Sequence, residues 1–127
     1  MITIQTPDAP QAIGPYSQAI KSGGVIYTSG QIGLMPNGEL SGSDVATQTH
    51  QVLKNLHYVL EAGGAKMSDV IKTTIYLADM NDFAEVNAIY ERYFGDHKPA
   101  RSTVEVSRLP KDVKIEIDCI AKPDTYR

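Results

Sequence analysis

The sequence predicts an α+β fold in which a single β-sheet is covered on one face by two helices. Three observations predict it. Segments rich in β-branched residues alternate with two segments of helical periodicity, glycine-rich or proline-containing turns separate them, and no linker or internal repeat divides the chain. The expected order of elements is ββαβαββ. The 127 residues are expected to form one domain, residues 1–127, which is long enough to bury a hydrophobic core.

The N-terminal half predicts two strands and a helix. Residues 17–35 read as two strands joined at 22–24, where two adjacent glycines accept positive φ, and a second turn follows at 35–40. From about residue 43 the pattern changes to helical spacing, and Gly63-Gly64 predicts the end of this helix. The positions with that spacing are Val45, Thr49, Val52, Leu53, Leu56, Val59 and Leu60.

The C-terminal half predicts a strand, a second helix and a further pair of strands. Residues 69–78 are rich in β-branched side chains and predict the strand. Residues 81–95 predict the helix, with Asp82 and Glu85 at the spacing of a capping box and Gly95 at its end.

Residues 98–122 predict a closing hairpin that turns at 109–112, because apolar and polar residues alternate along both arms. A four-residue turn places Glu105 opposite Glu116. One interpretation is a solvated sheet face with cross-strand ion pairs. The other is a functional site, since two facing carboxylates repel each other on a merely solvated surface. The residues expected on this charged face are Arg101, Thr103, Glu105, Glu116 and Asp118.

The strand within residues 25–34 carries apolar side chains on both of its expected faces. Val25 and Tyr27 alternate with Ile26, and Ile32 and Leu34 are expected on the side of Ile26. Two helices can cover only one face of a sheet. Another copy of the chain is therefore expected to cover the second face.

Four further residues have a structural and a functional interpretation. Asn87 lies among apolar residues on the second predicted helix, where it either ties the helix to a loop or contacts a ligand. Tyr16 follows a Gly-Pro turn and either caps the core or lines a site. Ser29 and Gly30 interrupt a strand, which indicates a β-bulge or the close approach of a ligand.

Several classes of function lack support in the sequence. The net charge of −3 argues against nucleic-acid binding through bulk electrostatics. Cys119 is the only cysteine, so an intrachain disulfide and a thiolate metal cluster are excluded, and its thiol is expected to pack inertly on the apolar face. The three histidines lack the spacing of a metal site, and no dinucleotide, P-loop or zinc-hydrolase motif occurs. We therefore expect no metal site.

The start of the chain has neither the basic nor the apolar region of a signal peptide, and no apolar run approaches the ~20 residues of a membrane span. The expected location is therefore the cytoplasm.

Five segments together resemble the RidA/YjgF family of reactive-intermediate deaminases. They are IGPYSQAI, TSGQIG, NDFAEVN with Tyr90, KPARS, and VEVSRLPKDVKIEIDCIA, and they span nearly the whole chain. The resemblance implies a fold like that of the small trimeric chorismate mutases and a homotrimer with three sites at subunit clefts. It also implies cofactor-free hydrolysis of 2-imino acids, such as 2-iminobutanoate and 2-iminopropanoate, to 2-keto acids and ammonia.

The motifs also imply roles for individual residues. Arg101 would hold the substrate carboxylate, and Glu116 would position or activate the attacking water. The family commonly has cysteine where this chain has Thr103. The resemblance implies a backbone role at that position, so deamination is expected to persist while thiol-based reactivity is not. The other positions that match the family's site are Tyr16, Ser29, Gly30 and Asn87.

Two other functions stay open on the sequence alone. One is a non-catalytic module that senses 2-keto acids or amino acids through the cleft of Arg101. The other is an RNA-acting translation inhibitor, against which the acidic charge balance and the lack of aromatics interleaved with basic residues weigh.

Overall fold

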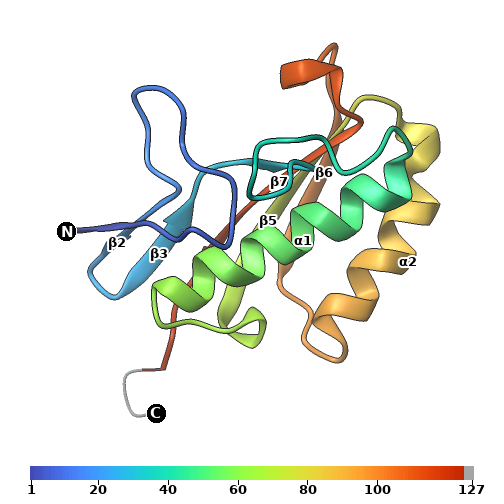
Figure 1. The fold of residues 1–127 in the computed structure, drawn as a ribbon. Coiled ribbons are helices and arrows are strands. Elements are labelled where there is room, and N and C mark those ends of the chain that lie inside the picture. Colours follow the sequence, from blue (N-terminus) through green and yellow to red (C-terminus); the bar gives the residue numbers. More distant parts are fainter. Residues whose placement is uncertain (125–127) are drawn as a thin grey trace.

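The computed structural model describes residues 1–124 and shows one mixed sheet with two helices on one of its faces (Figure 1). The strand order is β1-β2-β3-β7-β5-β6, and the short β4 also pairs with β7. The predicted α+β class and the order of its elements are confirmed, with β1 as an addition and the predicted strand within residues 25–34 divided into β3 and β4. The strands are β1 Ile2–Ile4, β2 Ala19–Ser22, β3 Val25–Thr28, β4 Gln31–Ile32, β5 Val70–Leu77, β6 Ala100–Glu105 and β7 Ile115–Ala121. The helices are α1 Val45–Ala62 and α2 Phe83–Phe94.

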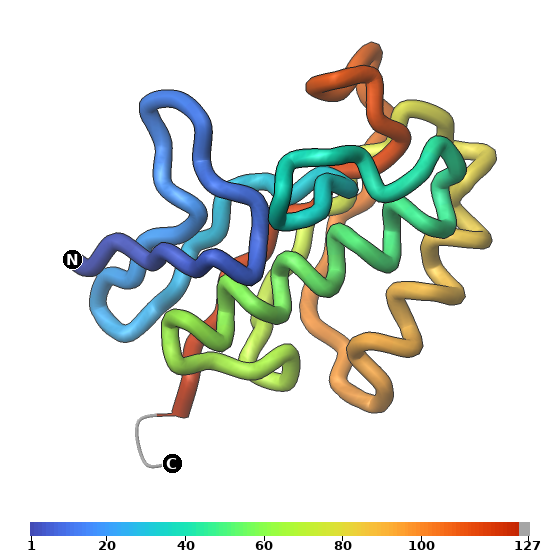
Figure 2. Tube along the Cα trace, in the orientation of Figure 1, coloured from blue at the N-terminus to red at the C-terminus, as the bar shows by residue number. Residues whose placement is uncertain are grey.

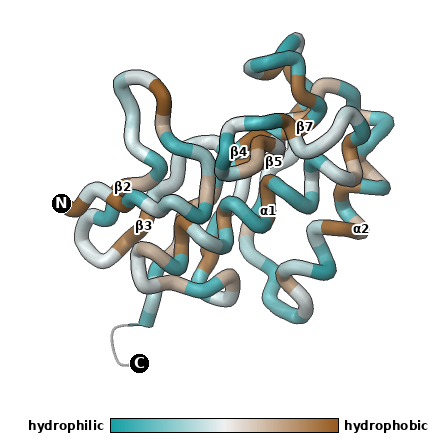
Figure 3. Tube along the Cα trace, viewed as in Figure 1, coloured by the Kyte–Doolittle hydropathy of each residue, from teal (hydrophilic) through white to brown (hydrophobic). Residues whose placement is uncertain are grey.

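The hydrophobic core lies between the helices and the sheet, where Figure 3 shows the hydrophobic positions of α1, α2 and the central strands gathered together. The apolar stripe predicted for α1 faces this core, and Val52, Leu53 and Val59 have no exposed surface. Alternate residues of β5 and β7 point into the same layer. Within residues 1–124, no helix is both long enough and apolar enough to cross a lipid bilayer.

The ends of α1 follow the prediction closely. The Asp44 carboxylate accepts the backbone N–H of Thr47 at 2.9 Å and so caps the N-terminus. The helix stops at Gly63, whose N–H bonds to the carbonyl of Leu60 at 2.9 Å. A side chain at Gly63 would collide with Ile4 and Ile26, so the absence of a Cβ lets this end of the helix pack directly on the sheet.

The capping box predicted for α2 is wrong. Asp82 stands at the N-cap position, but its side chain makes no capping hydrogen bond. A 3₁₀ turn directly precedes α2 and already provides an acceptor for the backbone N–H of Phe83. The capping side chain lies one turn earlier, where Asp79 accepts the N–H of Asn81 at 2.9 Å. Glu85 stays in the first helical turn, where a negative charge favours the helix dipole.

The predicted closing hairpin is also wrong. β6 and β7 are not neighbours, because β5 lies between them. β5 pairs in parallel with β6 and antiparallel with β7, and α2 is the crossover that joins the two parallel strands. A parallel pair requires such a long connection, and the strand–helix–strand order provides it. The segment 106–114 consequently crosses the width of β5, although its 3₁₀ turn does fall at Pro110–Asp112 as expected (Figure 2).

This topology separates the charged residues that were expected on one face. Directly paired residues point to the same side of a sheet. Arg101 pairs with Thr73, which is buried beneath the helices, whereas Glu116 pairs with Tyr76 on the opposite side. We call that opposite side, which neither helix covers, the open face. The helix-covered face carries Arg101, Thr103 and Glu105, and the open face carries Glu116 and Asp118.

The open face exposes apolar surface. The side chains of Tyr27 on β3 and Val104 on β6 are 48% and 41% exposed, and Ile120 of β7 is half-buried beside Tyr27. Ile32 also lies on this face because it pairs with Glu116, so its expected placement on the side of Ile26 is wrong. The irregularity between β3 and β4, described below, reverses the alternation at that point.

Candidate functional site

A β-bulge between β3 and β4 forms one wall of the candidate site. Tyr27 of β3 pairs with Ile120 of β7, and Gln31 of β4 pairs with Ile117 of β7. The segment from β3 to β4 therefore has one residue more than the stretch of β7 that it faces. The side-chain oxygen of Thr28 fills the break by accepting the backbone N–H of Cys119 at 2.9 Å. The interruption that the sequence shows at Ser29 and Gly30 is therefore a bulge.

The bulge brings the backbone of Gly30 against the side chain of Glu116. A Cβ at Gly30 would lie 2.7 Å from Cδ and 3.0 Å from Cγ of Glu116, which is closer than side chains pack. Ser29 is fixed beside it, because its hydroxyl donates to the carbonyl of Ser17 at 2.5 Å and its N–H donates to the carbonyl of Gln18 at 2.9 Å.

These residues line a cavity of about 610 Å³ on the open side of the sheet. Its walls are mainly apolar, with Ile13 and Ile32 among them, and Tyr16 from the N-terminal loop stands at its side with 55% of its surface exposed. Four of the predicted site residues line this cavity: Tyr16, Ser29, Gly30 and Glu116. We call this cavity the Glu116 cavity.

Glu116 has the electrostatics of a proton acceptor. Burial, and secondly the negative charge of Asp118, raise the pKa of the Glu116 carboxyl. Within residues 1–124 no hydrogen bond or ion pair reaches this carboxylate. A half-buried carboxylate of raised pKa that faces a cavity is typical of general acid–base sites.

Arg101 lies in a second group on the other face of the sheet. Its Nη1 donates to Oδ1 of Asn87 on α2 at 2.6 Å, and its guanidinium carbon lies 5.1 Å from the ring centre of Tyr90 and 5.4 Å from that of Phe83. Within the described part of the chain, no carboxylate pairs with this cation. The amide and the two rings orient the guanidinium, and its charge is not neutralised by a carboxylate among residues 1–124. Such an arginine is preorganised to bind an anion.

A second cavity, of about 370 Å³, opens beside this group and is lined by Asn87, Tyr90 and Arg101 among others. Tyr90 is held by a hydrogen bond of 2.8 Å between its hydroxyl and that of Thr73. Burial raises the pKa of Tyr90, so the ring stays neutral under the guanidinium. We call this cavity the Arg101 cavity.

Thr103 lines neither cavity. It follows Arg101 by two residues on the same face of β6, and its hydroxyl is buried without a hydrogen-bond partner among residues 1–124.

The predicted site residues therefore form two groups on opposite faces of one sheet. Arg101 and Asn87 meet directly, and the four residues of the Glu116 cavity meet at the bulge. Sequence reasoning missed three contributors: the rings of Phe83 and Tyr90, over which the Arg101 guanidinium lies, and the hydroxyl of Tyr76, which donates to Asp118 at 3.1 Å. The spacing of Phe83, Asn87 and Tyr90 on one side of a helix was the available signal for the two rings.

Comparison with protein families gives one match over most of the chain. The family described as Endoribonuclease L-PSP matches residues 6–122. A RutC family protein of Pyrococcus horikoshii is 57% identical over 119 residues, which cover 93% of this chain and 94% of that protein. The 2-iminobutanoate/2-iminopropanoate deaminase of Escherichia coli is 53% identical over 122 residues, which cover 94% of this chain and 95% of the enzyme.

Solved structures agree with the sequence matches. The crystal structure of the YjgF gene product of E. coli superposes with a TM-score of 0.93 at 52% identity, covering 98% of this chain and 100% of that one. The crystal structure of E. coli TdcF with bound serine superposes with a TM-score of 0.93 at 43% identity and the same coverage. The chain therefore belongs to the Endoribonuclease L-PSP family, which is the RidA/YjgF family that its motifs resemble.

Proposed function

We propose that this protein hydrolyses 2-imino acids to 2-keto acids and ammonia. The observation that carries the proposal is the pair of half-sites: an arginine that has no carboxylate counter-ion among residues 1–124, and a half-buried glutamate of raised pKa that has no hydrogen-bond donor among the same residues. The E. coli relative at 53% identity is named for this reaction with 2-iminobutanoate and 2-iminopropanoate. Both compounds carry the carboxylate that Arg101 would bind.

The chemistry follows from the two groups. The guanidinium of Arg101 holds the carboxylate of the substrate through two parallel hydrogen bonds, which fixes the position of C2. Glu116 takes a proton from a water molecule as the water oxygen adds to C2 of the protonated imine. The nitrogen of the resulting carbinolamine receives that proton from Glu116. The C–N bond then breaks and ammonia leaves, while Glu116 takes the proton of the C2 hydroxyl as the C2–O bond becomes a carbonyl. One water is consumed, and no redox change occurs.

Arg101 and Glu116 lie on opposite faces of one sheet, which supports a site that two copies of the chain complete together. We infer that in a homotrimer the β6 edge of one copy, which carries Arg101, packs beside the open face of the next, so that the Arg101 cavity of one copy meets the Glu116 cavity of the other. The exposed apolar side chains of Tyr27 and Val104 on the open face support this association. In this closed assembly the neighbouring copies also cover the open face, which the two helices leave exposed.

A mixing experiment tests the reaction and the shared site together. Arg101→Ala and Glu116→Gln are each expected to be inactive as homotrimers. When the two variants are unfolded, mixed in equal amounts and refolded, about a quarter of the sites regain an intact arginine and an intact glutamate, so about a quarter of the wild-type rate should return. Mixing without unfolding is the matched control. A mixture that stays inactive although mixed trimers form contradicts the shared site.

A second candidate is a non-catalytic module that binds amino acids or 2-keto acids. The structure of TdcF with bound serine favours it, because that relative at 43% identity holds an amino acid. The two candidates separate in an assay that couples a serine or threonine dehydratase to the release of keto acid. An enzyme accelerates the release at a small fraction of the substrate concentration, whereas a binder shows only saturation.

The family description also names an endoribonuclease. The net charge of −3 gives this chain little attraction for a polyanion, and Glu91 shares the Arg101 cavity with the arginine. We therefore place deamination first. RNA cleavage that co-purifies with the wild-type protein and is lost in Arg101→Ala would reverse this order.

A further inference from the structure

The carboxylate next to Glu116 on the same strand face carries an inference that rests on the proposed function. Glu116 and Asp118 are two residues apart on β7, about 6–7 Å along an extended strand. Both are half-buried on the open face, and both pair with residues of β5. Because two carboxylates at this distance repel each other, the pair is harder to ionise fully than one carboxylate alone. Unless their surroundings are equivalent, one of the two holds the first proton more often than the other.

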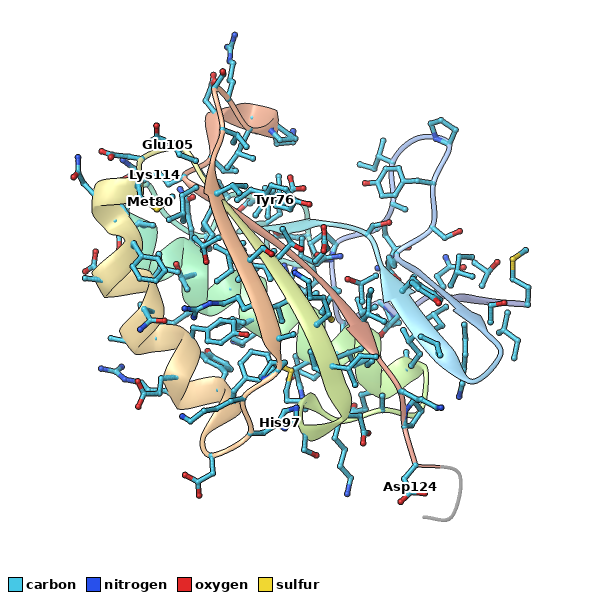
Figure 4. The ribbon with its side chains drawn as sticks, turned by 180° about the vertical axis from the view of Figure 1, so that it is seen from behind. Tyr76, Met80, His97, Glu105, Lys114 and Asp124 are labelled. Carbon is cyan, nitrogen blue, oxygen red and sulfur yellow. The ribbon has the colours of Figure 1, made fainter. Side chains whose placement is uncertain are left out.

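The surroundings of the two carboxylates are not equivalent. Tyr76 of β5 is the direct neighbour of Glu116 in the ladder, yet its hydroxyl reaches along the strand and donates to Oδ2 of Asp118 at 3.1 Å (Figure 4 labels Tyr76 on this face). Lys72, also on β5, adds positive charge on the side of Asp118, while its ammonium donates to Ser102 at 3.0 Å and to the carbonyl of Thr73 at 3.1 Å.

Both influences favour the charged form of Asp118, and among residues 1–124 neither Tyr76 nor Lys72 forms a hydrogen bond or ion pair with Glu116. The hydrogen bond of Tyr76 and the charge of Lys72 lower the pKa of Asp118 against the larger effect of burial, which raises it. For Glu116, burial and the charge of Asp118 both raise the pKa. Burial and the two carboxylates raise the pKa of Tyr76, so this hydroxyl keeps its proton and stays a donor.

Within the part of the chain that the structure describes, the other elements around Glu116 supply no opposing charge in contact with it. The bulge contributes Ser29 and Gly30, which do not titrate, and Tyr16 and Lys111 line the same cavity. Among residues 1–124, neither Tyr16 nor Lys111 forms a hydrogen bond or ion pair with Glu116.

We propose that Asp118 is a positioning residue for the reaction: fixed by the hydrogen bond from Tyr76, its carboxylate lies beside Glu116 on the same strand face and directs the proton of the water to Glu116. The two carboxylates therefore have different roles. Asp118 stays in its hydrogen bond with Tyr76, and Glu116, which of the two carboxylates alone lines the Glu116 cavity, exchanges the proton with water and substrate.

The test measures the titration of Glu116 directly, in the assembled full-length protein without substrate. Carboxyl ¹³C signals of labelled glutamate are followed against pH, and the signal absent from Glu116→Gln identifies the residue. In Asp118→Asn the pH midpoint of the Glu116 titration should be lower than in the wild-type protein. Asp118→Glu keeps the charge and should stay near the wild-type midpoint. Glu61→Gln, which removes one exposed carboxylate at the end of α1, is the matched control and should change nothing.

The rate profile gives a second readout. In Asp118→Asn the acid limb of kcat/KM should move to lower pH, and its plateau should fall by about two- to five-fold through kcat with KM unchanged, because a weaker base accepts the proton less well. Tyr76→Phe leaves both carboxylates in place and should cause a smaller movement in the same direction, because Asp118 then competes for the proton. If Asp118→Asn does not assemble, Tyr76→Phe alone serves as the test variant.

An unchanged Glu116 midpoint in both Asp118→Asn and Tyr76→Phe overturns the inference. So does a fall in kcat with a rise in KM and an unmoved acid limb, which is the result of a structural role alone. Wild-type protein without deaminase activity refutes the proposed function instead, and the titration still decides the role of Asp118.

Discussion

Replacing Gly30 by alanine should disable the site while leaving the fold intact. The new Cβ would lie 2.7 Å from Cδ of Glu116, and ordinary contact begins near 3.4 Å, so the carboxyl carbon must retreat by at least about 0.7 Å (3.4 − 2.7). The backbone at Gly30 does not have positive φ, so alanine is not strained there. A displacement of this size at a reacting group costs about 10- to 100-fold in turnover. On the transition-state scale this loss corresponds to about 1.4–2.7 kcal/mol.

Gly63→Ala is the matched control, because its Cβ would meet Ile4 and Ile26 in the core rather than the site. The two variants should fail in opposite ways. Gly30→Ala should keep its melting temperature within a few degrees and lose turnover, whereas Gly63→Ala should lose melting temperature and keep its turnover at 25 °C. Steady-state deamination rates and thermal melts measure both. The reasoning is refuted if Gly30→Ala keeps the wild-type rate, or if it costs as much again in a Glu116→Gln background, where no carboxylate remains to be displaced.

Four further outcomes are expected. Arg101→Lys keeps the charge but loses the planar fork, so calorimetry should show keto-acid binding weakened by about 1–3 kcal/mol, with turnover falling as well. Thr103→Cys should stay within a few-fold of the wild-type rate, and a loss of roughly 100-fold would show that the side chain takes part. Thr103→Val removes a buried hydroxyl without a partner and should raise the melting temperature. The folded-state pKa of Glu116 is raised, so its contribution to stability is full in acid and is lost as pH rises through that pKa. Glu116→Gln should therefore melt at a higher temperature than wild type at neutral pH and lose this advantage in acid, a comparison made by melts at both pH values.

The elements of this fold are readable from the sequence because each has a local signature. The helical spacing ends at Gly63, and the glycine there is required by packing against Ile4 and Ile26. The neighbours of a strand are not local. Alternation along residues 100–121 determines which side chains share a face of each strand, but it contains nothing that says β5 will insert between them. The face shared by Arg101 and Glu116 was mispredicted for this reason.

The sequence motifs identified candidate residues of the site, but they could not show where those residues lie in the fold. The sequence identifies Arg101, Asn87 and Glu116 as candidates, and the structure does bring Asn87 to Arg101. It could not show the bulge at Ser29, since one extra residue in a ladder is visible only when both strands are aligned. It also could not show the hydrogen bond from Tyr76 to Asp118, because that contact joins residues 42 positions apart in the chain.

Cys119 gives the protein a built-in chemical reporter. The thiol lies in β7, between β3 and β5, and is 2% exposed. Burial raises the pKa of this thiol to about 12, and the thiolate is the form that alkylating reagents attack. The folded chain should therefore resist labelling, and modification should occur only through molecules whose central strands have separated. Because the sequence has one cysteine, the labelling rate against denaturant measures the opening free energy at the middle of the sheet, with no engineered probe.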